Sequence, residues 1–434
     1  MTTASNQNGK LKREIGVFGA TMMGIGSMVG TGVFVSIGIA AGIAGPAVIL
    51  TIALAALVAT CNALSSAQLA ASMPVSGGTY EYGYAYLTPA LGFTAGWMFL
   101  CAKTASAATA ALGFAGYLLQ LIGFQFLVVP IAIAAVVALT AIVVMGISRS
   151  NRANIVIVSV TLFALVFFVQ AGLPQLWSKG PEPWLPFLPA SDGGSPRPSL
   201  LESTALMFVA FTGYARIATL GEEMRDPTRT IPQAIIYTLV VSALLYIAVG
   251  AVGIAAVGPD ALAEATRSDV APLLAAAKTF DLPAAHFIIS VGAITALLGV
   301  SLNLILGLSR VVLAMGRRGD LPATFVNVNG EGSPVPAIIA AGAAIAALSL
   351  IGKVEITWSF SAVTVLIYYA ITNLAALRLP NEKRLYPPVI AWAGLAACLG
   401  LAFFVEREIW MIGLGLIVAG LLWHGLARYL APRT

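Results

Sequence analysis

The stretch GIGSMVGTGVF, residues 24–34, has four glycines within nine residues. It places Gly24, Gly26, Gly30 and Gly32 inside an apolar segment that is long enough to cross a membrane as one helix. Each glycine inside a helix costs up to about 1 kcal/mol relative to alanine, so this cluster favours an interruption. Helix packing is the alternative, because Gly26-x-x-x-Gly30 has the small-residue spacing of closely packed membrane helices. A broken helix also accounts for Gly24 and Gly32.

The composition places the chain in a membrane. Its 434 residues are 59% hydrophobic and only 9% charged, whereas soluble domains carry roughly a quarter charged residues. Apolar runs of about 18 residues or more recur along the chain, and each can cross a hydrocarbon core of about 30 Å. The weak alternating segments of about 10 residues that are typical of membrane barrels are absent. We therefore predict an all-α integral membrane protein.

The apolar runs predict about twelve transmembrane helices. Their expected ranges are 15–44, 46–72, 91–123, 126–146, 152–175, 199–224, 232–257, 281–316, 334–352, 355–378, 387–404 and 408–429.

The basic residues predict the orientation. With the N-terminus inside, sixteen of the 23 Lys and Arg residues fall on the cytoplasmic side, six fall outside, and Lys103 lies within a span. This bias follows the positive-inside rule. We expect a multi-pass protein of the plasma (inner) membrane, surrounded by lipid, with both termini in the cytoplasm. The net charge of +5 reflects topology and not nucleic-acid binding, because the basic residues sit in short loops.

Catalytic and metal-binding patterns are absent from the sequence. His286 and His424 lack cysteine or carboxylate neighbours at metal-ligand spacing, and we expect surface or packing roles for both. Cys61, Cys101 and Cys398 all lie in apolar spans, where cysteine behaves as a small core residue. The glycine stretch follows no strand, which argues against a dinucleotide-binding fold. We predict no enzyme activity, no metal site and no cofactor.

A break at residues 24–32 predicts a binding site. Unwinding a membrane helix frees backbone groups, and each costs several kcal/mol in hydrocarbon unless a cavity and a ligand satisfy it. The N–H groups near Gly30 and Gly32 suit a carboxylate. The carbonyl groups from Met23 to Gly26 suit an ammonium group. The two ends of this break therefore match the two charges of an α-amino acid.

A second break is predicted in the sixth span. In ALMFVAFTGYARIATLGEEMRDP, residues 205–227, Thr212 and Gly213 interrupt an apolar helix between Phe211 and Tyr214. An ordinary kink is the alternative for this pair alone. Breaks in the first and sixth spans match an inverted repeat of five plus five helices with a site at the membrane midplane. We expect one transmembrane domain, 1–434, with repeats at 15–175 and 199–378 and two peripheral helices at 387–429.

Four motifs carry a family resemblance over nearly the whole chain. They are GSMVGTGVF at 26–34, MPVSGGTYEYGYAYLTPALGFTAGW at 73–97, FVAFTGYARIATLGEEMRDPTRTIPQAI at 208–235 and AMGRRGDLP at 314–322. Together they resemble the amino acid–polyamine–organocation (APC) superfamily of transporters, which have the LeuT-type fold. The resemblance implies secondary transport of an amino acid or a related amine by alternating access.

The resemblance also implies the substrate-binding residues. The first-span backbone at Ser27, Met28, Val29 and Gly30 would hold the carboxylate, beside Gly26, Thr31 and Gly32. Carbonyl groups near Met23, Phe208, Val209 and Phe211 would hold the amine, with Phe211 as an aromatic gate and Thr212, Gly213 and Tyr214 alongside.

Lys103 is the strongest single candidate for a functional charge, because it lies near the middle of the third span. An ionised lysine there costs at least about 2.5–3.5 kcal/mol, so it should face a cavity or a partner and is a candidate proton carrier. A structural lysine held by helix carbonyls, or one reaching the interface, is the alternative. In several relatives a fifth-span lysine replaces a sodium ion, but Thr161 stands at the matching position here. Sodium coupling through Thr161, Thr295 and Ser301 therefore stays open beside proton coupling.

The remaining polar candidates have weaker signals. Glu222 and Glu223 end the sixth span on the cytoplasmic side, where they are either solvated or part of an inner gate. Candidates for side-chain specificity are Ser106, Thr109, Tyr214, Asn303, Ser359 and Ser361, although interhelical hydrogen bonding is the commoner role of Ser and Thr in membranes.

The substrate that fits best is a neutral L-amino acid. The spans place no acidic residue beside the breaks to neutralise a second positive charge, and Lys103 adds a positive charge of its own. A cationic amino acid or polyamine transporter of the same fold is the alternative. A channel is a more remote alternative, because these spans lack the continuous polar lining that a pore needs. The sequence predicts no particular protein partner.

Overall fold

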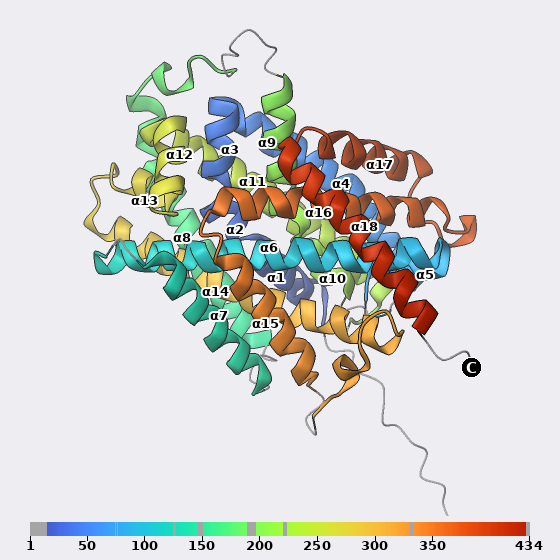
Figure 1. Cartoon of the computed structure of the whole chain (residues 1–434). Helices are drawn as coiled ribbons and strands as arrows, with labels where there is room; N and C mark the ends of the chain where they lie inside the picture. Colours follow the sequence, from blue (N-terminus) through green and yellow to red (C-terminus); the bar gives the residue numbers. More distant parts are fainter. Residues whose placement is uncertain are drawn as a thin grey trace, which may run out of the picture.

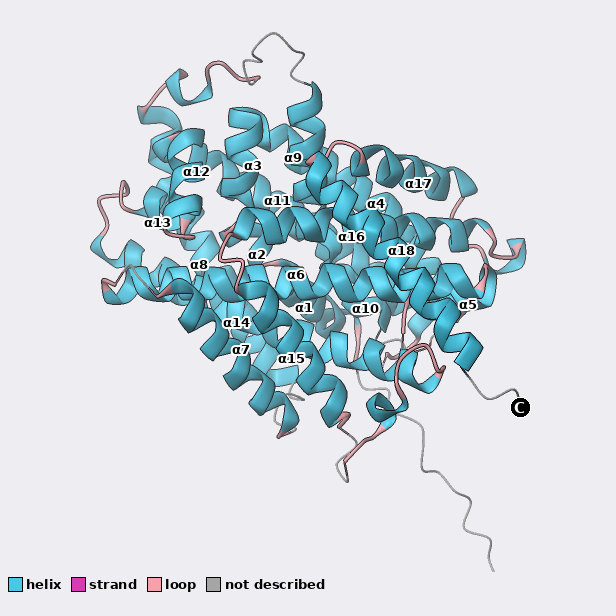
Figure 2. Ribbon diagram, in the orientation of Figure 1, coloured by secondary structure: helices cyan, strands magenta, loops and turns pink. Residues whose placement is uncertain are grey.

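The computed structural model describes residues 15–430, except 74, 76, 125–126, 146–150, 189–196, 220–223 and 330–332. Helices dominate this part of the chain, and its strand-like pairing is limited to one parallel bridge between Ile15 and Met224. The all-α prediction is confirmed for the described residues (Figure 2).

Figure 1 shows the order of the helices. The α-helices are α1 (Val17–Met28), α2 (Thr31–Phe34), α3 (Ser36–Ala44), α4 (Val48–Ser72), α5 (Thr79–Tyr86), α6 (Pro89–Ile122), α7 (Val128–Val144), α8 (Asn151–Ser178), α9 (Arg197–Phe211), α10 (Ala215–Thr219), α11 (Pro227–Val257), α12 (Pro259–Ser268), α13 (Pro272–Ala277), α14 (Pro283–Arg317), α15 (Val335–Ser349), α16 (Val354–Leu377), α17 (Pro388–Ala402) and α18 (Arg407–Leu430). The short 3-10 turns are η1 (Gly45–Ala47), η3 (Glu182–Trp184), η4 (Thr212–Tyr214), η6 (Ala323–Val326) and η7 (Asn381–Lys383).

The helices fall at the expected spans. Among the described residues, 8 helical stretches are long and apolar enough to cross a membrane. Three shorter apolar helices, α7, α15 and α17, coincide with three further expected spans. The expected span 199–224 is the interrupted helix formed by α9, η4 and α10. The multi-span prediction is therefore confirmed.

Helix α6 lies at the centre of the bundle, where it packs lengthwise against α14 and α16 (Figure 1). Its middle part, residues 102–116, consists mainly of alanine, serine, threonine and glycine. Small residues let the backbones of neighbouring membrane helices approach closely. This composition explains why Lys103, in the middle of α6, is enclosed by other helices and only 7% exposed.

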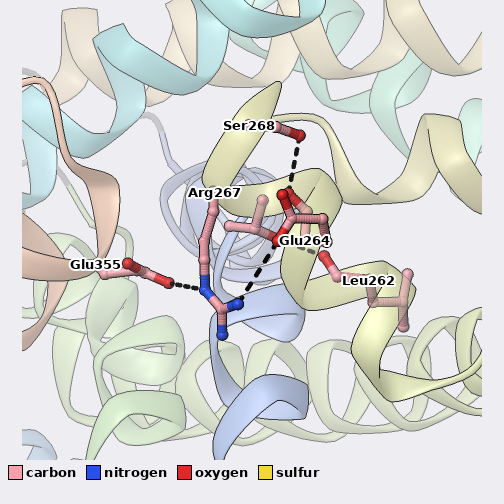
Figure 3. A network of polar contacts seen from close by, with 6 residues as sticks. Leu262, Glu264, Arg267, Ser268 and Glu355 are labelled. Carbon is pink, nitrogen blue, oxygen red and sulfur yellow. Dashed lines mark hydrogen bonds and ion pairs between the residues drawn. The ribbon is translucent and has the colours of Figure 1, made fainter.

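The end of the bundle that carries α12, here called the α12 end, is closed by tight packing. A Cβ atom at Gly38 of α3 would lie 1.9 Å from the hydroxyl oxygen of Thr266 in α12, so only glycine allows this approach. Arg267 of α12 extends to Glu355 at the start of α16, with 3.2 Å between Nε and Oε1 (Figure 3). The short helix α12 thus bridges the first and tenth spans.

The opposite end, here called the α5 end, is organised by one buried carboxylate. Asp320, in the turn after α14, accepts hydrogen bonds from the hydroxyl groups of Tyr80 and Tyr84 of α5 at 2.7 and 2.6 Å. Its other oxygen lies 3.0 Å from Nδ1 of His424 in α18, which stacks on Phe93 as a packing residue. Burial, together with the bond to Asp320, raises the pKa of both tyrosines. One carboxylate therefore ties α5 and α14 to the last helix.

Candidate functional site

The first span is interrupted at the expected place. Helix α1 ends at Met28, Gly30 has φ −163° and ψ −107°, and α2 begins at Thr31. The N–H of Gly30 donates to the carbonyl of Met28 at 3.0 Å and not to Gly26, as a continuing helix would require. Among the described residues, the N–H groups of Thr31 and Gly32 have no acceptor. The helical ladder is broken. Of the N–H groups predicted to bind a carboxylate, those of Thr31 and Gly32 are free, whereas those of Val29 and Gly30 donate to the carbonyl groups of Ile25 and Met28.

The glycines of this stretch also serve helix packing. A Cβ atom at Gly30 would lie 2.4 Å from Val300 of α14, and one at Gly32 would lie 2.7 Å from Ala210 of α9. Gly24 and Gly26 are equally close to side chains of α11 and α8. Both interpretations of the glycine stretch therefore apply, since the same residues allow the break and let four helices surround it.

The sixth span is interrupted by a tightened turn. Helix α9 ends at Phe211, η4 follows as a 3-10 turn, and α10 resumes at Ala215. Three carbonyl groups at this break accept hydrogen bonds from side-chain hydroxyl groups: Val209 from Thr212 at 2.8 Å, Ala210 from Tyr246 at 3.2 Å and Thr212 from Tyr369 at 3.3 Å. Hydroxyl groups of the protein thus occupy three carbonyl groups of the second break, whereas at the first break the N–H groups of Thr31 and Gly32 have no acceptor among the described residues.

The two breaks lie against each other. A Cβ atom at Gly213 would be 2.4 Å from the carbonyl oxygen of Ser27 and 2.7 Å from the backbone nitrogen of Met28. Tyr246 of α11 spans both breaks, because its hydroxyl group lies 2.7 Å from the Met28 carbonyl and 3.2 Å from that of Ala210. Main-chain groups from two distant parts of the sequence therefore form one site.

A cavity with about 910 Å³ of empty space, including its open part, adjoins the breaks. Its lining consists of Ser27, Met28, Thr31, Gly32, Gly77, Phe99, Lys103, Ser106, Val209, Ala210, Thr212, Gly213, Ala215, Arg216, Val300, Asn303, Leu304, Gly307, Arg310, Val311 and Trp358. Gly77 and Arg310 belong to the α5 end, so the cavity extends from the breaks toward that end.

Lys103 faces this cavity. Its Nζ donates to the hydroxyl oxygen of Thr212 at 2.8 Å, and that hydroxyl group donates in turn to the Val209 carbonyl at 2.8 Å. The lysine is thereby fixed at the carboxyl end of α9, where the helix dipole is negative. The side chain contacts the second break and does not face lipid.

Comparison with known proteins identifies the family. A family model described as amino acid permease matches residues 19–432, which is most of the chain. The chain belongs to the amino acid permease family. This confirms the APC resemblance, and since the family and its relatives are transporters, the permease is a multi-pass membrane transporter and not an enzyme.

Three relatives illustrate this similarity. The permease is 38% identical to an uncharacterized transporter of Mycobacterium tuberculosis, over 98% of this chain and 93% of the relative. It is 30% identical to a branched-chain amino acid permease of Bacillus subtilis, over 76% of this chain and 72% of the relative. It is 33% identical to a methylthioribose transporter of the same bacterium, over 75% and 72%.

The structure brings together about half of the expected substrate-binding residues. Those that line the cavity of the permease are Ser27, Met28, Thr31, Gly32, Val209, Thr212 and Gly213. Met23, Gly26, Val29, Gly30, Phe208, Phe211 and Tyr214 lie outside its lining. Phe211 is fully buried and packs on Tyr246, with 5.1 Å between ring centroids, so its role as a gate stays a prediction.

The three candidates for sodium coupling, Thr161, Thr295 and Ser301, lie outside the cavity lining. The hydroxyl groups of Thr161, Thr295 and Ser301 donate to carbonyl groups of their own helices at 2.9, 2.6 and 2.8 Å. Each oxygen keeps a lone pair for a cation, so a sodium site there stays a prediction. Glu222 and Glu223 lie outside the described residues. No group of three His, Cys, Asp or Glu in the described part of the chain is placed to hold a metal ion.

The specificity candidates divide into two groups. Ser106 and Asn303 line the cavity. Thr109 pairs with Thr357 at 2.7 Å, and Ser361 pairs with Ser106 at 2.7 Å, so these contacts join α6 to α16. Sequence reasoning missed the apolar wall formed by Phe99, Val300, Leu304, Val311 and Trp358. Apolar residues carry no signal that separates a cavity wall from a lipid-facing or core position.

Proposed function

We propose that the permease is a secondary active transporter of a neutral L-amino acid that works by alternating access. The observation that carries this proposal is the meeting of two interrupted helices at one cavity, with Gly213 against the backbone of Ser27. The free N–H groups of Thr31 and Gly32 offer a site for the carboxylate. The carbonyl group of Ser27, which lines the cavity and lacks the helical partner that residue 31 would supply, offers a site for the ammonium group.

The cavity wall supports an apolar side chain on the substrate. Phe99, Leu304 and Trp358 belong to three different helices and line the same space. The described lining contains no carboxylate and three cationic side chains, which are Lys103, Arg216 and Arg310. A second positive charge on the substrate would meet repulsion there, which disfavours cationic amino acids and polyamines. A branched-chain amino acid permease is 30% identical to the chain, and cationic amino acid transporters of Arabidopsis thaliana are 26–27% identical, so the preference for a neutral substrate rests on the cavity lining.

The expected topology gives the cavity a direction. The Lys and Arg distribution assigns the α5 end to the cytoplasm, so a cavity that reaches Gly77 and Arg310 corresponds to an inward-facing state. The packed α12 end then closes the outer side. We further propose a plasma (inner) membrane location with cytoplasmic termini and the two repeats at 15–175 and 199–378.

Transport by purified protein in liposomes tests this function. We expect saturable uptake of radiolabelled L-leucine and its acceleration by unlabelled L-leucine trapped inside, since a carrier shows counterflow. Competition by L-arginine should be weak. Methylthioribose, which has neither an ammonium nor a carboxylate group, should not compete. Uptake without saturation would indicate a channel, and preferred binding of methylthioribose or arginine would contradict the proposed substrate class.

A further inference from the structure

Lys103 shares its part of the cavity with the proposed ammonium site. Its Nζ donates to Thr212, and the next residue, Gly213, abuts the Ser27 carbonyl to which we assign the substrate amine. A lysine ammonium group has three N–H donors. Thr212 accepts one of them and is the one acceptor of Lys103 within the described residues. The tethered cation and a substrate ammonium group would therefore occupy neighbouring positions in the cavity.

The described residues that line the cavity offer no carboxylate to balance two cations. The charged groups that line the same cavity are Arg216 of α10 and Arg310 of α14, and both are positive. From α16, Tyr369 reaches the break with a neutral hydroxyl group that donates to the Thr212 carbonyl at 3.3 Å. At short range in a medium of low polarity, like charges repel strongly. One of the two ammonium groups must then lose a proton or leave.

We propose that Lys103 releases its proton when the amino acid binds, an inference that rests on the function proposed above. The Nζ–H bond breaks and the proton passes to water in the cavity. The neutral amine keeps an N–H donor for Thr212, and its new lone pair accepts a hydrogen bond from the substrate ammonium group. Lys103 thus changes from a repelling cation into a ligand for the substrate.

This exchange defines the coupling. Each carrier holds either a proton on Lys103 or an amino acid beside the neutral lysine, but not both. The permease is therefore an exchanger of amino acid for proton. In liposomes, an acidic interior should drive accumulation of L-leucine and an acidic exterior should oppose it.

Calorimetry of the purified permease tests the step directly. L-leucine is titrated at one pH in two buffers that differ in ionisation enthalpy, and the difference in heat counts the protons exchanged. We expect about one proton released per leucine bound and an affinity that rises about tenfold per pH unit. Zero release, or proton uptake, would overturn the proposal, since uptake indicates that Lys103 pairs with the substrate carboxylate.

Substitutions separate this inference from the proposed function. Lys103→Met should bind L-leucine with no proton release and no pH dependence. Lys103→Arg, whose guanidinium group stays charged, should lose affinity at least tenfold. Lys278→Met, at an exposed lysine near the α12 end, is the matched control and should release protons as the wild type does. Failure of the wild type to bind any neutral amino acid would instead refute the proposed function, while the wild-type proton count decides the inference even where a variant does not fold.

Discussion

Substitution of Gly213 by alanine tests whether contact between the two breaks is required. The added Cβ atom would lie 2.4 Å from the Ser27 carbonyl oxygen and 2.7 Å from the Met28 nitrogen. Both atoms belong to the backbone, so they cannot rotate away, and the breaks must separate by about 1 Å to restore ordinary contact. Overpacking of this kind costs about 1–3 kcal/mol. If the cost falls on the bound state, the Kd for L-leucine rises about 5- to 150-fold.

The assay is equilibrium binding of radiolabelled L-leucine to the purified variant, with the thermal midpoint measured in parallel. Gly415→Ala in α18 is the matched control, because a Cβ atom there has no neighbour within 4 Å. We expect wild-type affinity and an unchanged or higher midpoint for the control. A Gly213→Ala variant that binds L-leucine as tightly as the wild type would refute the reasoning that the two breaks form one site through this contact.

Four further substitutions or conditions probe other contacts. Tyr246→Phe removes the hydroxyl group that spans both breaks and should lower the free energy of unfolding by about 1–2 kcal/mol in a thermal shift; no change would mean that the bridge is dispensable. Asp320→Asn should lower the free energy of unfolding by about 2–4 kcal/mol in the same assay, because the hydroxyl groups of Tyr80 and Tyr84 and the ring of His424 lose a charged partner. Arg267→Ala should change stability by less than about 1 kcal/mol, since the Arg267 and Glu355 side chains are 54% and 39% exposed; a larger loss would give this pair a structural role. Burial raises the pKa of Tyr84, so the free energy of unfolding should fall as the pH rises above about 10, the pKa of a tyrosine in the unfolded chain. Tyr84→Phe should make this fall with pH less steep.

The helical architecture was predictable because hydrophobicity is a local property of the chain. Apolar runs set the spans without reference to their partners, and the structure places helices at all of the expected positions. The break after Met28 was predictable for a similar reason, since the glycines from Gly24 to Gly32 weaken the helix where they stand. The sixth-span break was predicted in position, but its form, the 3-10 turn η4, depends on hydroxyl donors from other helices.

Local properties of the sequence establish that the chain crosses a membrane many times, that two of its helices are interrupted, and that Lys103 cannot face lipid. Only the packing of the helices brings Gly213 to Ser27 and Lys103 to Thr212, and only this packing gives the cavity an apolar wall from α6, α14 and α16. The physical reason is separation along the chain. A backbone propensity or the cost of a buried charge is set by a residue and its immediate neighbours, whereas a contact across 109 or more residues exists only once the helices have packed.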